Sequence, residues 1–111
     1  MKTLLESNDR SSSRMPLDLD VTLFHHQGSP MSARLQDISF GGVYVATNNS
    51  PPIVDSTVTL GLSLFENGAE KVYSMSAVVV RTEDKGAGLM FDDYDGETVK
   101  CLRKLYHDAL N

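Results

Sequence analysis

The chain has 111 residues, of which 41% are hydrophobic, 23% charged and 7% aromatic. This mixture is typical of one globular domain and excludes disordered, collagen-like and membrane-spanning classes. The net charge is −5, from 10 basic and 15 acidic residues. A field of that sign repels nucleic acid, so we expect no nucleic-acid partner. The single cysteine, Cys101, excludes a disulfide framework, and no segment is apolar enough for a signal or a bilayer crossing. We therefore expect a cytoplasmic protein.

Residues 1–14 are predicted to form a flexible N-terminal arm. The segment contains four serines and has no apolar face that folding could bury. Order in this arm must therefore come from a bound partner. Residues 15–111 are predicted to form the folded domain.

From Pro16 onward, apolar and polar residues alternate, as is typical of half-buried strands. We expect strands over residues 17–24, 31–36, 43–47, 58–64, 72–81 and 87–91, separated by segments rich in Gly, Pro, Asn and Asp. Short strands at regular spacing without intervening helices indicate an antiparallel barrel or sandwich. The sequence thus predicts a mainly all-β fold with six strands.

Near the C-terminus the apolar spacing becomes helical and predicts a helix over about residues 95–110. One stripe of this helix is apolar (Val99, Leu102, Leu105, Tyr106 and Ala109). Asp95 is the expected N-cap, and Glu97 suits the positive end of the helix dipole. Cys101 lies beside the stripe, so we expect it to pack at the edge of the helix–barrel contact.

The first candidate motif is Arg10-Ser-Ser-Ser-Arg14 in the predicted arm. Two guanidinium groups four residues apart on a flexible segment can converge on one multiply charged anion. Arginine binds phosphate through two parallel hydrogen bonds, and the same geometry matches the O6/N7 edge of guanine. Alone, the pair is better explained as two solvated charges on a disordered tail.

The second candidate motif is Asp37-Ile-Ser-Phe-Gly-Gly42, which fits the pattern DxSxxG. In an extended segment Asp37 and Ser39 project to the same side. The carboxylate can accept hydrogen bonds from N1–H and N2–H₂ of guanine, and Gly42 permits close approach of a ligand. A turn between strands that Asp or Ser stabilises explains the same residues without a ligand.

Together, the two motifs resemble those of the PilZ domain family of bacterial cyclic di-GMP receptors. The resemblance extends from Arg10 to the C-terminal helix and includes the segments Val79-Val-Arg81 and Gly86-Ala-Gly-Leu-Met-Phe91. It implies a six-stranded antiparallel PilZ-type β-barrel with a C-terminal α-helix. It also implies that the ligand lies on one outer face under the arm, held by Arg10, Arg14, Asp37, Ser39 and Gly42. Arg81, at a strand end beside this face, is an additional candidate.

The function that the resemblance implies is non-enzymatic. We expect a single-domain effector that binds cyclic di-GMP, orders its arm and signals through an unidentified protein in motility, exopolysaccharide or virulence control. The expected state is a monomer or weak dimer, with no cofactor besides this ligand. Many members have a further arginine just before or inside the first motif, whereas here Asp9 precedes Arg10. This difference predicts weaker phosphate binding. The alternative is a PilZ-like adaptor that contacts proteins without binding nucleotide.

Other polar groupings are interpreted as structural. His25 and His26 are adjacent in a strand and point to opposite faces, so we expect no metal site. Asp18 and Asp20 share a strand face without an accompanying cleft or third polar group, and a charged outer face explains them better than catalysis. A nucleic-acid-binding barrel is a third possibility, which the low aromatic content disfavours.

Overall fold

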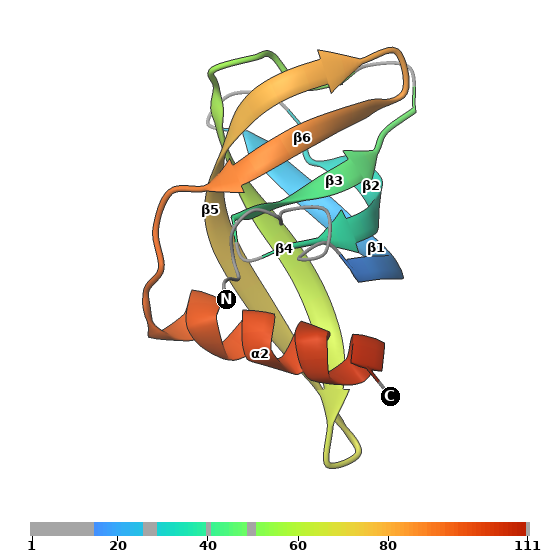
Figure 1. Ribbon diagram of the computed structural model, residues 1–111, viewed down its shortest axis with the longest axis vertical. Helices are drawn as coiled ribbons and strands as arrows, with labels where there is room; N and C mark the ends of the chain where they lie inside the picture. Colours follow the sequence, from blue (N-terminus) through green and yellow to red (C-terminus); the bar gives the residue numbers. More distant parts are fainter. Residues whose placement is uncertain (1–14, 26–28, 40, 49–50, 111) are drawn as a thin grey trace, which may run out of the picture.

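Alternation of apolar and polar side chains lets each strand bury one face inside a closed barrel. The computed structural model describes residues 15–25, 29–39, 41–48 and 51–110. Its strands are β1 (Met15–His25), β2 (Met31–Ile38), β3 (Gly42–Ala46), β4 (Thr57–Glu66), β5 (Ala69–Glu83) and β6 (Gly86–Phe91). Neighbours pair antiparallel in the order β1–β2–β3–β6–β5–β4, and pairing of β1 with β4 closes the barrel (Figure 1). The predicted six-stranded antiparallel barrel is confirmed.

The strands β4 and β5 extend further than the apolar pattern indicates. Their pairing continues from Thr57↔Val78 to Glu66↔Ala69, next to a turn at Asn67 and Gly68. Backbone hydrogen bonds, which need no apolar side chains, carry the ladder past the last buried residue. The end of this hairpin projects beyond the helix in Figure 1.

The inward side chains of all six strands form one apolar core. Its largest fully buried strand members are Tyr73, Leu23, Leu35, Ile38, Leu60, Met75, Val43, Val45, Val58 and Val79. Helix α2 (Gly96–Leu110) lies across one end of the barrel and contacts β5 and β1 (Figure 1). In the described part of the chain, no helix combines the length and the apolar character needed to cross a membrane.

The helix is rotated relative to the expected apolar stripe. Its buried face comprises Thr98, Cys101, Leu102 and Leu105, whereas Val99 is half-buried. The expectation that Cys101 packs at the edge of the contact is wrong, because its side chain is completely buried in the core. Small side chains at Thr98 and Cys101 allow the helix axis to approach the strands closely. Burial raises the pKa of the Cys101 thiol to about 12, which keeps it neutral and unreactive near pH 7.

The outer face of β1 is charged, as predicted from Asp18 and Asp20. Both carboxylates accept hydrogen bonds from Arg34 on β2, which the sequence analysis did not single out. Arg34 Nε lies 2.5 Å from Asp18 Oδ1, and Arg34 Nη1 lies 2.6 Å from Asp20 Oδ1. The hydrogen bond from Arg34 lowers the pKa of Asp18. Since all three side chains are exposed, the ion pairs contribute little to stability.

The cap of α2 gives a testable prediction. Asp95 Oδ1 accepts a hydrogen bond from the Thr98 backbone N–H at 2.8 Å, and this bond lowers the pKa of Asp95. Asp95→Ala should lower the melting temperature at pH 7 by roughly 3–6 °C. A carboxyl with a lowered folded-state pKa stabilises the fold above its unfolded pKa, and that contribution disappears as the pH falls through the folded value.

The measurement is thermal unfolding by circular dichroism between about pH 7 and about pH 2, with the difference between wild type and variant vanishing at the acid end. Asp93→Ala, an exposed carboxylate just before the helix, is the control and should melt like the wild type. Equal melting temperatures of Asp95→Ala and wild type at pH 7 would contradict the capping role.

Candidate functional site

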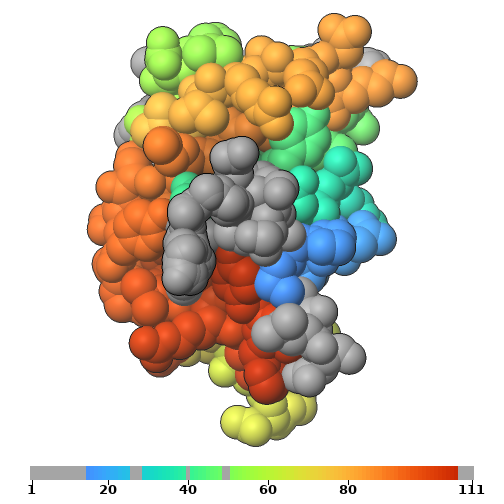
Figure 2. Space-filling model, in the orientation of Figure 1, coloured from blue at the N-terminus to red at the C-terminus, as the bar shows by residue number. Residues whose placement is uncertain are grey.

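Four residues form a row across the outer face of β2, β3, β6 and β5. The backbone register pairs Asp37 with Tyr44, Tyr44 with Gly88, and Gly88 with Arg81. Adjacent strands lie about 4.8 Å apart, so the row spans about 14 Å. In Figure 2 the green surface of β3 lies between the teal surface of β2 and the gold surface of β5. Two candidate residues, Asp37 and Arg81, thus belong to one continuous wall.

Glycines on β6 make the middle of this wall flat. Gly86 and Gly88 occupy the outward positions of β6, whereas Ala87 and Leu89 point into the core. A Cβ at Gly86 would lie 2.1 Å from the Tyr44 hydroxyl oxygen, and one at Gly88 would lie 3.0 Å from Arg81 Nε. Both side chains can therefore lie across β6 because it carries no side chains there.

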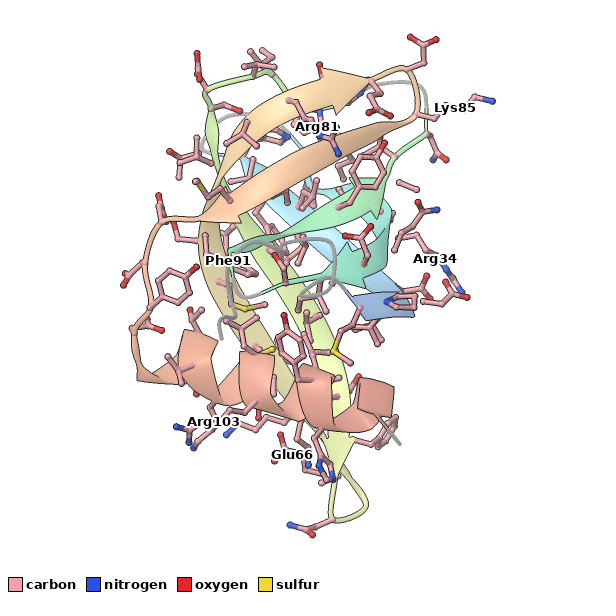
Figure 3. All side chains as sticks on the ribbon, viewed as in Figure 1. Arg34, Glu66, Arg81, Lys85, Phe91 and Arg103 are labelled. Carbon is pink, nitrogen blue, oxygen red and sulfur yellow. The ribbon has the colours of Figure 1, made fainter. Side chains whose placement is uncertain are left out.

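A small polar network orients Tyr44 and Arg81. Tyr44 Oη donates a hydrogen bond to Glu83 Oε1 at 2.8 Å, and Arg81 Nη1 lies 3.6 Å from Glu83 Oε2. Arg81 Cζ lies 5.5 Å from the centre of the Tyr44 ring, within the range of a cation–π contact. Burial, followed by the bond to Glu83, raises the pKa of Tyr44. The Arg81 side chain is 63% exposed and is available to a ligand (Figure 3).

The second motif continues past β2 into a turn. Ser39 Oγ accepts a hydrogen bond from Gly42 N at 3.2 Å and donates one to Gly42 O at 3.3 Å. The Ser39 backbone N–H also donates to Gly42 O at 2.8 Å. A hydroxyl has one donor and two acceptor sites, so one acceptor site of Ser39 is left for another group. The turn thus accounts for the serine without a ligand.

Gly42 is required by the contact between β3 and β6. A Cβ at this position would lie 2.0 Å from the Leu89 backbone oxygen, in the strand that pairs with β3. No side-chain rotation can relieve this overlap, because the opposing atom belongs to the backbone. Packing of β3 against β6 therefore requires glycine at position 42, in addition to the expected role of Gly42 in leaving room for a ligand.

The other candidates are distributed as follows. Arg10 and Arg14 lie outside the described residues. Asp37 is half-buried on β2, and the buried Ser39 directly follows this strand. Sequence reasoning missed Tyr44 and Glu83 as members of the wall. The signal that could have revealed them is glycine at alternate positions of β6, which places both glycines on its outward face.

The wall suits a ligand with hydrogen-bond donors better than a bare anion. Asp37 and Glu83 are acids, and Arg81 is the basic residue of the row and its network. A purine edge that carries both N–H donors and oxygen or nitrogen acceptors matches this mixture. Within the described ranges there is no group of His, Cys, Asp and Glu side chains that could hold a metal ion.

Comparison with known proteins identifies one family and several similar structures. A family model described as PilZ domain matches residues 8–108. No curated protein matches the sequence significantly.

Solved structures of similar fold include the PilZ domain of CeSA from a cellulose-synthesizing bacterium. It has a TM-score of 0.69 and 17% identity, with 88% of this chain and 98% of that chain covered. The Bacillus subtilis inhibitor of motility (MotI/DgrA) has a TM-score of 0.63 and 19% identity. The match covers 86% of this chain and 50% of that chain. An uncharacterized Legionella protein has a TM-score of 0.54 and 20% identity, with 88% and 98% covered.

The two glycines at the β2–β3 turn give a matched test of packing. Gly42→Ala should destabilise the protein by about 3 kcal/mol, because the new methyl group overlaps the Leu89 carbonyl. Gly41→Ala is the control, since the nearest atom to its Cβ would be Ser39 Oγ at 3.9 Å. Urea unfolding measures both changes. Equal stability of the two variants would contradict the close approach of β3 and β6.

Proposed function

Since this chain belongs to the PilZ domain family, we propose that it is a receptor for cyclic di-GMP that signals through a partner protein. PilZ domains generally act as receptors or adaptors, and the family model matches residues 8–108, which include both candidate motifs. The observation that carries the proposal is the row from Asp37 through Tyr44 and Gly88 to Arg81.

This row offers complementary groups for guanine. The Asp37 carboxylate can accept hydrogen bonds from N1–H and N2–H₂ of the base. Arg81 can donate to O6 and N7 or stack on the base, in the way that arginine commonly meets guanine. Tyr44 and Arg81 lie across Gly86 and Gly88, and a planar base can stack on the outer side of these two side chains. Specific base recognition is thus assigned to the rigid strands.

The phosphates are assigned to Arg10 and Arg14. The row itself is poor in positive charge, so a dianionic ligand needs cations from elsewhere. Met15 pairs with Ile38, and Pro16 pairs with Asp37. The segment that carries Arg14 therefore joins the barrel beside Asp37, within reach of a base held there.

Binding would order residues 1–14 against the outer face of the barrel. A segment that becomes ordered changes the surface presented to a second protein without rearrangement of the core. The output is thus transmitted through this surface, and the partner recognises the closed arm.

Calorimetric titration tests the binding site. Wild type should bind cyclic di-GMP, and Arg14→Ala and Asp37→Ala should each weaken binding at least tenfold, since each removes charge-assisted hydrogen bonds. Arg103→Ala, which removes an exposed positive charge on α2, should bind like the wild type. Circular dichroism must show that all variants remain folded. Equal affinity of wild type and both site variants would refute the assignment.

Amide NMR tests the arm. Saturation with cyclic di-GMP should raise the heteronuclear NOE values of Ser11, Ser12 and Ser13, because the two flanking arginines become fixed on the phosphates. Arg10→Ala, measured at a ligand concentration that saturates it, should show a smaller rise. Values that are identical in the free and saturated wild type would refute arm ordering while leaving the base site intact.

A constitutive protein adaptor is the second candidate. It is favoured by the turn in which Ser39 and Gly42 satisfy one another without a ligand. The adaptor predicts no heat of binding with cyclic di-GMP and the same affinity for a purified partner with and without nucleotide. The receptor predicts that nucleotide changes that affinity.

A further inference from the structure

The outer wall continues beyond Tyr44 into an open depression that the base site described above does not use. Its volume is about 870 Å³, within the range of small-molecule sites. Its lining includes Gln36, Tyr44, Thr47, Glu83, Asp84 and Lys85. The depression lies beside Lys85, at the outer end of the β5–β6 hairpin. This is the side of the barrel away from Arg103 on α2 (Figure 3).

The backbone holds this depression in a defined place. Glu83 pairs with Gly86, so Asp84 and Lys85 form a two-residue turn between β5 and β6. The Thr47 backbone N–H donates to the Lys85 carbonyl at 2.9 Å, which ties the end of β3 to this turn. The backbone that carries Asp84 and Lys85 therefore has a defined position relative to β3.

One buried polar atom at this site has no partner among the described residues. The Thr47 side-chain hydroxyl is buried, and Thr47 as a whole is 7% exposed. A buried hydroxyl without a hydrogen bond is unfavourable, and most such groups in folded proteins are satisfied. Rotation about χ1 exchanges the hydroxyl with the methyl group, so a molecule seated in the depression can provide the missing partner.

We infer that this depression binds the second guanine of the same cyclic dinucleotide, with Asp84 accepting from its N1–H and N2–H₂ and Lys85 donating to its O6 and N7. The inference rests on the proposed function, which assigns the first guanine to Asp37 and Arg81. An adenine lacks the two adjacent N–H donors of guanine, so the Asp84 carboxylate discriminates against it.

The spacing of the two base sites is compatible with one ligand. Tyr44 and Glu83 belong both to the wall of the first site and to the lining of the depression. The row through Ala46, Gly86 and Glu83 lies two residues along the strands from the row through Tyr44 and Gly88, a step of about 7 Å. A ligand with two linked bases can therefore occupy both sites around the Tyr44–Glu83 contact.

Titration of variants with two nucleotides tests this inference. Wild type should bind cyclic di-GMP about tenfold more tightly than cyclic GMP-AMP, because the second ligand places adenine in the depression. Asp84→Asn should lose this preference, and Lys85→Gln should weaken binding of cyclic di-GMP severalfold. The controls Asp93→Asn and Arg103→Gln make the same charge changes at exposed positions away from the depression. Both controls should behave like the wild type.

Thr47→Val provides a second measurement. Replacement of a buried unpaired hydroxyl by a methyl group should leave the melting temperature of the free protein equal or higher. The affinity for cyclic di-GMP should nevertheless fall severalfold, because the bound base loses a hydrogen-bond partner. If Thr47→Val weakens ligand binding without lowering the melting temperature, the loss of affinity cannot be caused by damage to the barrel.

The outcomes separate this inference from the proposed function. Wild-type binding of cyclic di-GMP with unchanged affinity in Asp84→Asn and Thr47→Val overturns the second base site alone. Equal wild-type affinity for cyclic di-GMP and cyclic GMP-AMP overturns it as well. Absence of any binding by the wild type overturns the proposed function and this inference together.

Discussion

The pairing of β3 with β6 is the constraint on which the site depends. It joins the β1–β2–β3 sheet segment to the β4–β5–β6 segment, and the second seam between β1 and β4 closes the barrel. At Gly42 the two backbones approach so closely that no side chain fits between them. This contact brings Tyr44 opposite Gly88, and so connects Asp37 at one side to Arg81 at the other.

The two faces of β6 have different structural roles. Its inward side chains Ala87, Leu89 and Phe91 belong to the core, whereas its outward positions at Gly86 and Gly88 carry no side chain. Tyr44 and Arg81 fill the space above these glycines and are held there by Glu83. The outer wall can therefore be specialised for a ligand without loss of core packing, because the alternation of a strand separates the two faces.

The charges of the wall and of the arm are complementary. Asp37, Glu83 and Asp84 outnumber Arg81 and Lys85 along the wall and its extension. Under the proposed function, this acidic surface meets base edges, and the arginines of residues 1–14 meet phosphates. Neither part suffices alone for a dianionic dinucleotide, because carboxylates repel phosphate and isolated arginines do not select a base. Under the same proposal, the combination would couple ligand binding to the position of the arm.

The amino-acid sequence alone determined the strands, the C-terminal helix, the cap at Asp95 and the charged outer face of β1, because alternation, helical spacing and capping are local patterns. The tertiary structure decided that β3 pairs with β6, that Arg34 bonds to Asp18 and Asp20, and that Cys101 is buried. It also decided that Tyr44, Glu83 and Arg81 meet across Gly88. Alternation of apolar and polar residues shows which side chains share a face of one strand. It does not show which other strand lies beside that strand. That choice follows from barrel closure and packing over the whole chain.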